Sequence, residues 1–189
     1  VVCLPLEDAP APGLRLGAAA NRPPAAPLNS SVGTSSGKKG ESPRDTAETI
    51  EAMGVDAIVV RHGSAGVPRQ VAQWAQAAVI NAGDGWHEHP TQALLDCYTI
   101  REQLGSLTDR HIAIVGDIKH SRVARSDVLA FTALGAPVTP VAPPPFLPPS
   151  LEGWPVAVRH ALPHGLPPID TVHLLRIPKA PTTEAPLPP

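Results

Sequence analysis

The sequence predicts an α/β protein built on parallel β-sheets that are covered by helices on both faces. Segments with helical spacing of apolar residues alternate with short segments that are apolar throughout. Continuously apolar strands are typical of parallel sheets buried on both sides. Hydrophobic residues make up 42% of the 189 residues, which is sufficient for one large core or two smaller ones.

Six strands and four helices are expected. The strands are residues 1–6, 56–61, 78–82, 111–115, 138–141 and 171–175. The helices are a first one from about residue 45 to Gly54, and then residues 67–77, 90–104 and 121–134. The helix at 90–104 is the clearest, because Pro90 suits a first helical position and Gly105 suits the residue after the end.

The chain divides into two units. A break at residues 104–110 separates a first domain, residues 1–104, from a second, residues 105–178. The 25 prolines lie mainly toward the two ends, where they disfavour helices and inner strands, and residues 179–189 are expected to be a disordered tail. The chain starts inside a strand without an initiator Met, so we expect a fragment that lacks the N-terminal edge of the first domain and part of the second.

Composition argues against several classes of partner. A net charge of -2, with 17% charged residues, provides no basic face for nucleic acid and no polybasic patch for a membrane. The sequence has no apolar run long enough to span a bilayer. Two cysteines are too few for a disulfide framework, so a cytoplasmic location is expected, with Cys97 in the core rather than acting as a nucleophile.

Polar groups follow three of the expected strands, where parallel sheets bind ligands. Arg61 could hold a phosphate or carboxylate, or form an ordinary surface ion pair. His89, Thr91 and Gln92 begin a helix and could polarise a carbonyl group, or serve only as a solvated helix cap. Arg122 lies at another helix start, where a cation is favourable only if an anion binds beside it.

Two further interpretations stay open from the residues alone. Ser35 and Lys39 lie in a Gly-rich stretch that could wrap a phosphate or be a mobile surface loop. The turn that contains Asp84, His87, Glu88 and His89 could supply zinc ligands to a metal hydrolase, although two histidines two residues apart are a weak indication.

Five segments resemble the aspartate carbamoyltransferase family. They are NAGDGWHEHPTQALLD at 81–96, VGDIKHSRVARSD at 115–127, TSSGKKGESPRDT at 34–46, AMGVDAIVVRH at 52–62 and HLLR at 173–176. The likeness extends almost continuously from about residue 29 to residue 176. The HPTQ turn is also similar to the ornithine branch, whereas the second segment favours the aspartate branch.

The resemblance implies transfer of a carbamoyl group from carbamoyl phosphate to the amino group of L-aspartate, in de novo pyrimidine biosynthesis. It implies a homotrimer with active sites shared between subunits, no cofactor and no metal, and it allows for a regulatory or dihydroorotase partner chain. By position, Arg61, His89 and Gln92, with Thr91 beside them, would hold the carbamoyl phosphate. Ser35 and Lys39 would reach the adjacent subunit's site, and Arg122 and Arg176 would bind the aspartate carboxylates.

One segment departs from the family pattern. The family's phosphate-binding turn, a Ser-Thr-Arg-Thr-Arg run, is replaced here by Ala9, Pro10, Ala11, Pro12 and Gly13. This turn has no side-chain donor, and each proline also removes a backbone N–H. The alternative function is therefore a catalytically impaired paralogue or fragment that assembles with an intact carbamoyltransferase.

Overall fold

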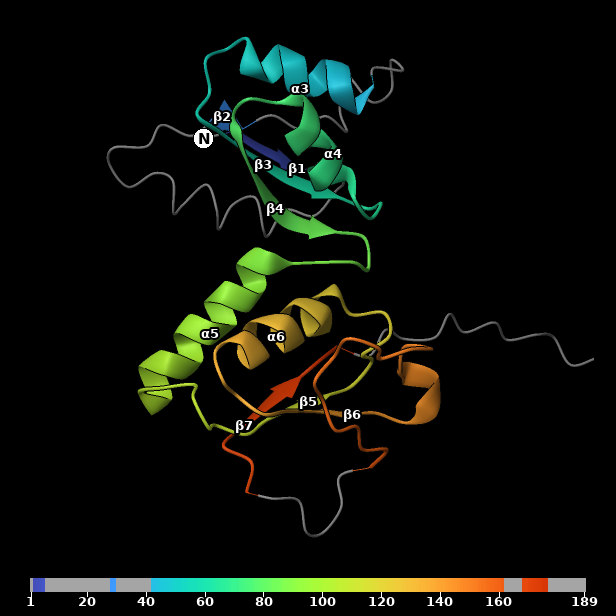
Figure 1. Ribbon diagram of the computed structural model, residues 1–189. Helices are drawn as coiled ribbons and strands as arrows, with labels where there is room; N and C mark the ends of the chain where they lie inside the picture. The colour runs from blue at the N-terminus through green and yellow to red at the C-terminus, as the bar shows by residue number, and fades with distance from the viewer. Residues whose placement is uncertain (1, 6–27, 30–41, 162–167, 177–189) are drawn as a thin grey trace, which may run out of the picture.

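The computed structural model describes residues 2–5, 28–29, 42–161 and 168–176 (Figure 1). Helices and strands alternate and every strand pair is parallel, which confirms the predicted α/β class. The elements in chain order are β1 (Val2–Pro5), β2 (Leu28–Asn29), α3 (Pro43–Glu51), β3 (Ala57–His62), α4 (Val67–Trp74), β4 (Ala78–Asp84), α5 (Pro90–Leu104), β5 (Ile112–Val115), α6 (Arg122–Ala133), β6 (Val138–Val141), the 3-10 helix η2 (Pro144–Phe146) and β7 (Thr171–Leu174).

The first sheet has the strand order β2-β1-β3-β4. Its core is formed where α3 and α4 pack against β3, with the buried apolar side chains Ala47, Ile50, Ile58, Val60, Val67 and Val71. The pairing of β3 with β4 shifts register between Val60 and His62. Such an irregularity changes the direction of the side chains near it, and here it falls at Arg61.

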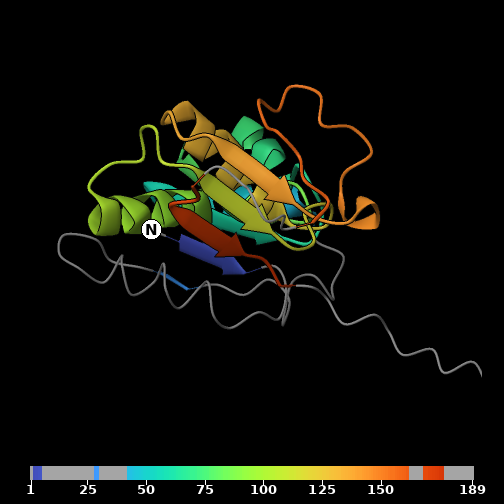
Figure 2. The same cartoon turned by 90° about the horizontal axis from the view of Figure 1, so that it is seen from below.

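The second sheet has the order β6-β5-β7, with β5 at its centre (Figure 2). Ile112 and Ile114 of β5 are fully buried, as are Val128 and Phe131 of α6. These side chains belong to one apolar cluster, so α6 and β5 form the centre of the second core.

Helix α5 connects the two sheets. It follows β4 of the first sheet, yet its inward residues Cys97 and Ile100 belong to the core of the second. Its bounds confirm the expectation for residues 90–104, and Gly105 follows its end with a φ of 79°. Burial, reinforced by the negative charges of Asp127 and Asp96, raises the pKa of Cys97 to about 11, which supports a role in packing rather than as a nucleophile.

Most expected elements differ by one to three residues from those observed, and three of the differences have a structural meaning, in extent or in burial. Helix α4 ends at Trp74 instead of residue 77, because the backbone N–H groups of Gln76 and Ala77 bind the Glu51 carboxylate on α3. Strand β4 continues to Asp84, beyond the predicted residue 82. In β7, partly buried and exposed positions alternate, with Leu174 73% exposed, so the expected burial on both faces does not hold for this strand.

None of the helices in the described ranges is both long and apolar enough to cross a membrane. The expected tail at residues 179–189 lies outside the described residues, as does the turn from Ala9 to Gly13.

The second core can be tested by truncating Phe131, which is fully buried at the centre of the cluster. F131A should lower the free energy of unfolding by about 3–5 kcal/mol, because it removes apolar contacts and leaves a cavity. L129A is the matched control on the same helix, since Leu129 is 48% exposed, and it should cost about 1 kcal/mol or less. Urea denaturation followed by circular dichroism measures both, and equal losses would contradict this description of the core.

Candidate functional site

A cavity of about 1150 Å³ lies at the carboxyl ends of the strands of both sheets. From the first sheet it is lined by Gly63 after β3, by Gly85 and Trp86 after β4, and by Gln92 in the first turn of α5. From the second sheet it is lined by the turn between β5 and α6 and by residues 173–176 at the end of β7. The location is where open parallel sheets bind ligands, and two sheets contribute to it.

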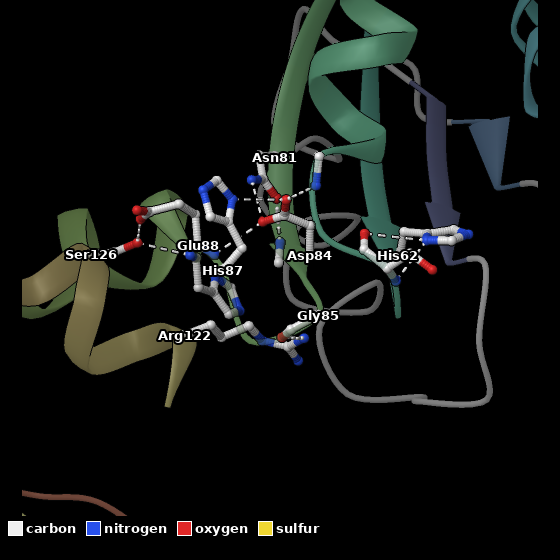
Figure 3. Close-up of polar contacts among 12 residues, drawn as sticks. His62, Asn81, Asp84, Gly85, His87, Glu88, Arg122 and Ser126 are labelled. Carbon is white, nitrogen blue, oxygen red and sulfur yellow. Dashed lines mark hydrogen bonds and ion pairs between the residues drawn. The ribbon is translucent and has the colours of Figure 1, made fainter. Parts of the chain in front are cut away.

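Gly83 brings two guanidinium groups together. A Cβ built at this glycine would lie 3.1 Å from Nε of Arg122 and 3.2 Å from Nη1 of Arg61. Arg61 donates to the carbonyl of Ala82 at 3.2 Å. Figure 3 shows the second arginine, Arg122, which donates to the carbonyl of Gly85 at 2.9 Å. One cation therefore comes from each half of the chain, and the pair favours binding of an anion.

The turn after β4 is organised by the buried carboxylate of Asp84 (Figure 3). It accepts hydrogen bonds from the backbone of Gly66 at 2.7 Å, from the Asn81 amide at 2.9 Å and from the backbone of Glu88 at 3.0 Å. Burial alone would raise the pKa of Asp84, but these bonds and the contact with His87 lower it below the ordinary value. Asp84 is thus an ionised structural anchor rather than a proton donor.

His89 has its tautomer fixed by the start of α5. Its Nδ1 accepts a hydrogen bond from the backbone N–H of Gln92 at 3.3 Å, and the Thr91 hydroxyl lies 3.3 Å from the same atom. The backbone N–H of His89 donates to the Ser126 hydroxyl at 2.8 Å, which attaches the turn to α6. With Nδ1 as acceptor, the neutral ring carries its proton on Nε2 and can donate it in a hydrogen bond to a ligand.

The electrostatic surroundings hold His89 in this neutral form. Burial, together with the positive charges of Arg122 and Arg61, lowers the pKa of His89 to about 4. A neutral imidazole near two guanidinium groups can polarise a carbonyl oxygen by hydrogen bonding without transferring its proton.

Gln92 extends this arrangement into the cavity that it lines. Its Nε2 donates to both carboxylate oxygens of Asp96, one turn further along α5, at 3.1 and 3.3 Å. The amide oxygen is then the atom of Gln92 that can accept from a ligand N–H.

Most of the predicted site residues lie close together, and two lie outside the described part of the chain. Two arginines, Arg61 and Arg122, pack against Gly83, and their charges lower the pKa of His89. The large cavity is lined by Gln92, Arg122 and Arg176. Thr91 contacts His89. Ser35 and Lys39 lie outside the described residues.

The zinc interpretation of the turn has no support from its contacts. Nδ1 of His87 is 3.1 Å from the Asp84 carboxylate, and the Glu88 carboxylate accepts from the Ser126 hydroxyl (Figure 3). Nδ1 of His89 is the cap acceptor described above. Among the described residues, the cluster with metal-binding spacing lies elsewhere, at Asp96, Asp127 and His173.

Two site features were missed by the sequence interpretation. Gly83 was not among the candidate site residues, although its lack of a side chain admits both arginines. Ser126 was not considered, yet its hydroxyl joins α6 to Glu88 and His89. Ser126 could have been predicted from its position four residues after Arg122, because residues four apart lie on one face of a helix.

A family model matches residues 16–102, and it describes the carbamoyl phosphate-binding domain of aspartate and ornithine carbamoyltransferases. The chain is 54% identical over 177 residues to the aspartate carbamoyltransferase catalytic subunit of Thermobifida fusca, covering 94% of this chain and 56% of that protein. It is 53% identical over 187 residues to the corresponding subunit of Kineococcus radiotolerans, covering 94% of this chain and 58% of that protein. The chain thus spans a little over half the length of these relatives.

Solved structures agree with the sequence relatives. Aspartate transcarbamoylase from Trypanosoma cruzi in complex with carbamoyl aspartate and phosphate superposes with a TM-score of 0.83 at 32% identity, covering 93% of this chain and 62% of that one. The catalytic subunit of M. jannaschii aspartate transcarbamoylase superposes with a TM-score of 0.80 at 32% identity, covering 94% of this chain and 60% of that one. The chain therefore belongs to the aspartate carbamoyltransferase family.

Proposed function

We propose that this chain transfers the carbamoyl group of carbamoyl phosphate to the amino group of L-aspartate, in the cytoplasm, as a step of pyrimidine biosynthesis. The observation that carries this proposal is the grouping of Arg61, Arg122 and the neutral His89 beside a cavity between the two sheets, which Arg122 and Gln92 line. Both substrates are anions and the reacting centre between them is a carbonyl group, so guanidinium groups and a neutral N–H donor match the chemistry required.

In the proposed reaction the aspartate amine attacks the carbonyl carbon of carbamoyl phosphate. A C–N bond forms, the bond between the carbonyl carbon and the phosphate oxygen breaks, and the leaving phosphate takes the electron pair. The proton lost by the amine passes to the phosphate. Negative charge develops on the carbonyl oxygen during the attack, and stabilising it is the principal task of the site.

Each side chain has a role that its contacts support. Nε2–H of His89 would donate to the carbonyl oxygen, and Thr91 would help to hold the ring through its contact with Nδ1. The Gln92 amide oxygen would accept from the carbamoyl NH2, because Asp96 already occupies the amide nitrogen. Arg61 would bind phosphate oxygens or the carbonyl oxygen.

Arg122 and Arg176 would bind the two carboxylates of aspartate. They line one cavity from the start of α6 and from the residues after β7, so an aspartate between them would present its amine toward His89 and Gln92. Ser35 and Lys39 would complete the site of a neighbouring subunit in a homotrimer. Assembly with a regulatory or dihydroorotase chain remains compatible with this arrangement.

We also propose that the two sheets are the two substrate domains, residues 1–104 for carbamoyl phosphate and 105–178 for aspartate. Each sheet has its own apolar cluster, which supports the division. Helix α5 would be the hinge element, because its inward face packs with the second cluster while its first turn carries the carbamoyl-binding residues.

The segment from Ala9 to Gly13 favours a second candidate function, that of an impaired chain that assembles with an intact carbamoyltransferase. It contains no side-chain hydrogen-bond donor where the family's phosphate-binding turn is expected. A charged hydrogen bond is worth about 1.5–3 kcal/mol, so loss of several would weaken carbamoyl phosphate binding severely.

Formation of carbamoyl aspartate by the purified chain distinguishes the two candidates. Turnover comparable with that of an intact family member would support the enzyme, and H89A should then lower kcat by about 10²–10³-fold, because it removes the donor to the carbonyl oxygen. H160A is the control, since His160 is exposed and does not line the cavity. No turnover, together with a mixed trimer formed with an intact catalytic chain, would favour the assembly role.

The charge state of His89 gives a prediction that does not require turnover. Its ring should titrate with a midpoint of about 4 in a carbon-detected NMR titration. R122Q should raise this midpoint, because it removes a positive charge beside the ring, whereas R69Q on the exposed side of α4 should leave it unchanged. The pKa of an unfolded histidine is about 6.5, so protons bind more strongly to the unfolded chain than to folded His89. The stability that the neutral ring contributes is therefore complete above that pH and is lost as the pH falls toward 4.

The packing of Gly83 against the two arginines yields a paired test. G83A should reduce kcat/KM by about tenfold or more, because the new methyl group displaces the guanidinium groups of Arg61 and Arg122. G54A is the matched control: Gly54 also has a positive φ, of 73°, but nothing lies within 4 Å of a Cβ placed there. Equal kinetic effects of the two variants would mean that backbone strain, and not displacement of the arginines, causes the loss.

A further inference from the structure

A cluster of three ionisable side chains lies beside the cavity, and the proposed reaction does not use it. It consists of Asp96 on α5, Asp127 on α6 and His173 on β7. One ligand atom from each lies within 4.8 Å of the others. The three residues lie on separate elements, and the cluster exists because α5 packs beside α6 (Figure 1) while His173 of β7 contacts Asp127 of α6.

Asp127 is the member whose environment requires an explanation. Its side chain is fully buried, and neither carboxylate oxygen has a hydrogen-bond donor within the described part of the chain. Nδ1 of His173 is 3.1 Å from Oδ2, but the contact lacks the alignment of a hydrogen bond. A carboxylate removed from water without donors is strongly disfavoured, and such groups are normally paired or bound to a metal.

We propose that Asp96, Asp127 and His173 form a binding site for one divalent transition-metal ion, with Zn²⁺ as the ion that best fits this ligand set. Two carboxylates and one imidazole provide oxygen and nitrogen ligands with a combined charge that balances the cation. Ligand atoms at about 2.0–2.2 Å from one ion lie about 3–4 Å apart, so the cluster needs only a small contraction. Hard cations such as Mg²⁺ prefer oxygen ligands alone, and the imidazole disfavours them.

The surroundings of the cluster are compatible with such a site. Asp96 is held by the Gln92 amide, which donates to both of its oxygens, and metal-bound carboxylates are usually oriented in this way. Gln92 and His173 both line the large cavity, so an ion has a path from solvent to Asp127. Burial, with the negative charge of Asp96 as a second cause, raises the pKa of Asp127 to about 8, as expected for a carboxylate that has no bound cation beside it.

The ion would fasten α5, α6 and β7 to one another. Through Asp96 it would also fix the side chain of Gln92, so the metal site and the cavity would be mechanically connected. The metal would have no part in bond making or breaking, and the site does not depend on the carbamoyl transfer proposed above.

The test is a titration of the full chain with ZnCl2 after treatment with a chelator and dialysis. Isothermal calorimetry should give one ion per chain, and Co²⁺ in place of Zn²⁺ should produce visible absorption bands from an ordered ligand set. D127N keeps the shape of the side chain and removes its charge, and it should weaken binding at least tenfold. H173Q is the second variant, for use if D127N does not fold, because His173 is partly exposed and tolerates a change more readily.

H160Q is the control for adventitious binding to surface histidines, and it should retain the affinity of the unmodified chain. Absence of a saturable site for either metal would overturn the proposal. So would equal affinity in D127N, H173Q and the unmodified chain. A third outcome also refutes the site. If D127N stabilises the metal-free chain and leaves metal binding unaltered, Asp127 is a buried neutral acid and not a metal ligand.

Discussion

The hydrogen bond from the backbone of Gln92 to Nδ1 of His89 is the interaction on which the remaining site depends. It caps the first turn of α5, where the same N–H group also donates to the His89 carbonyl at 3.0 Å, and it marks where the helix begins. It also determines which ring nitrogen carries the proton, since an Nδ1 that accepts leaves Nε2 as the donor. A single contact therefore marks the helix start and sets the tautomer and the direction in which the ring can donate.

The position of that helix start is set by two further attachments. Ser126 on α6 accepts from the His89 backbone and donates to Glu88, while Cys97 and Ile100 anchor the other end of α5 in the second core. The turn after β4 is itself held by the buried Asp84. Because both sheets restrain α5, the groups that it presents are preorganised, and preorganisation of donors is a major source of enzymatic rate enhancement.

Local sequence patterns predicted the helices and strands well where residues within or next to the element determine its ends. The helix at 90–104 was predicted with its observed bounds, because Pro90 and Gly105 mark its ends, and the strand at 138–141 was also correct. The end of α4 was wrong, because Glu51 on a different helix captures the next two backbone N–H groups. Likewise, the exposure of one face of β7 depends on what packs beside it, which a run of apolar residues does not reveal.

The same distinction applies to the site. Arg61, His89, Gln92 and Arg122 could be selected from the sequence because each stands at a strand end or a helix start, where ligands are bound. The grouping of Asp96, Asp127 and His173 could not, since none of them stands in a motif with the others and only the packing of three elements brings them together. The role of Gly83 was hidden for a similar reason, because it depends on two side chains that arrive from other parts of the chain.

The burial of Cys97 has a practical consequence for studying how the two sheets move. Its thiol faces the second core from α5 and ionises only at strongly alkaline pH, so alkylating reagents and peroxide have little access to a reactive thiolate while the helix is seated. Cys97 lines a small cavity beside α5, and movement of α5 away from the second core would expose its thiol further. A change in the modification rate of Cys97 would thus report movement of the proposed hinge helix, without an added label.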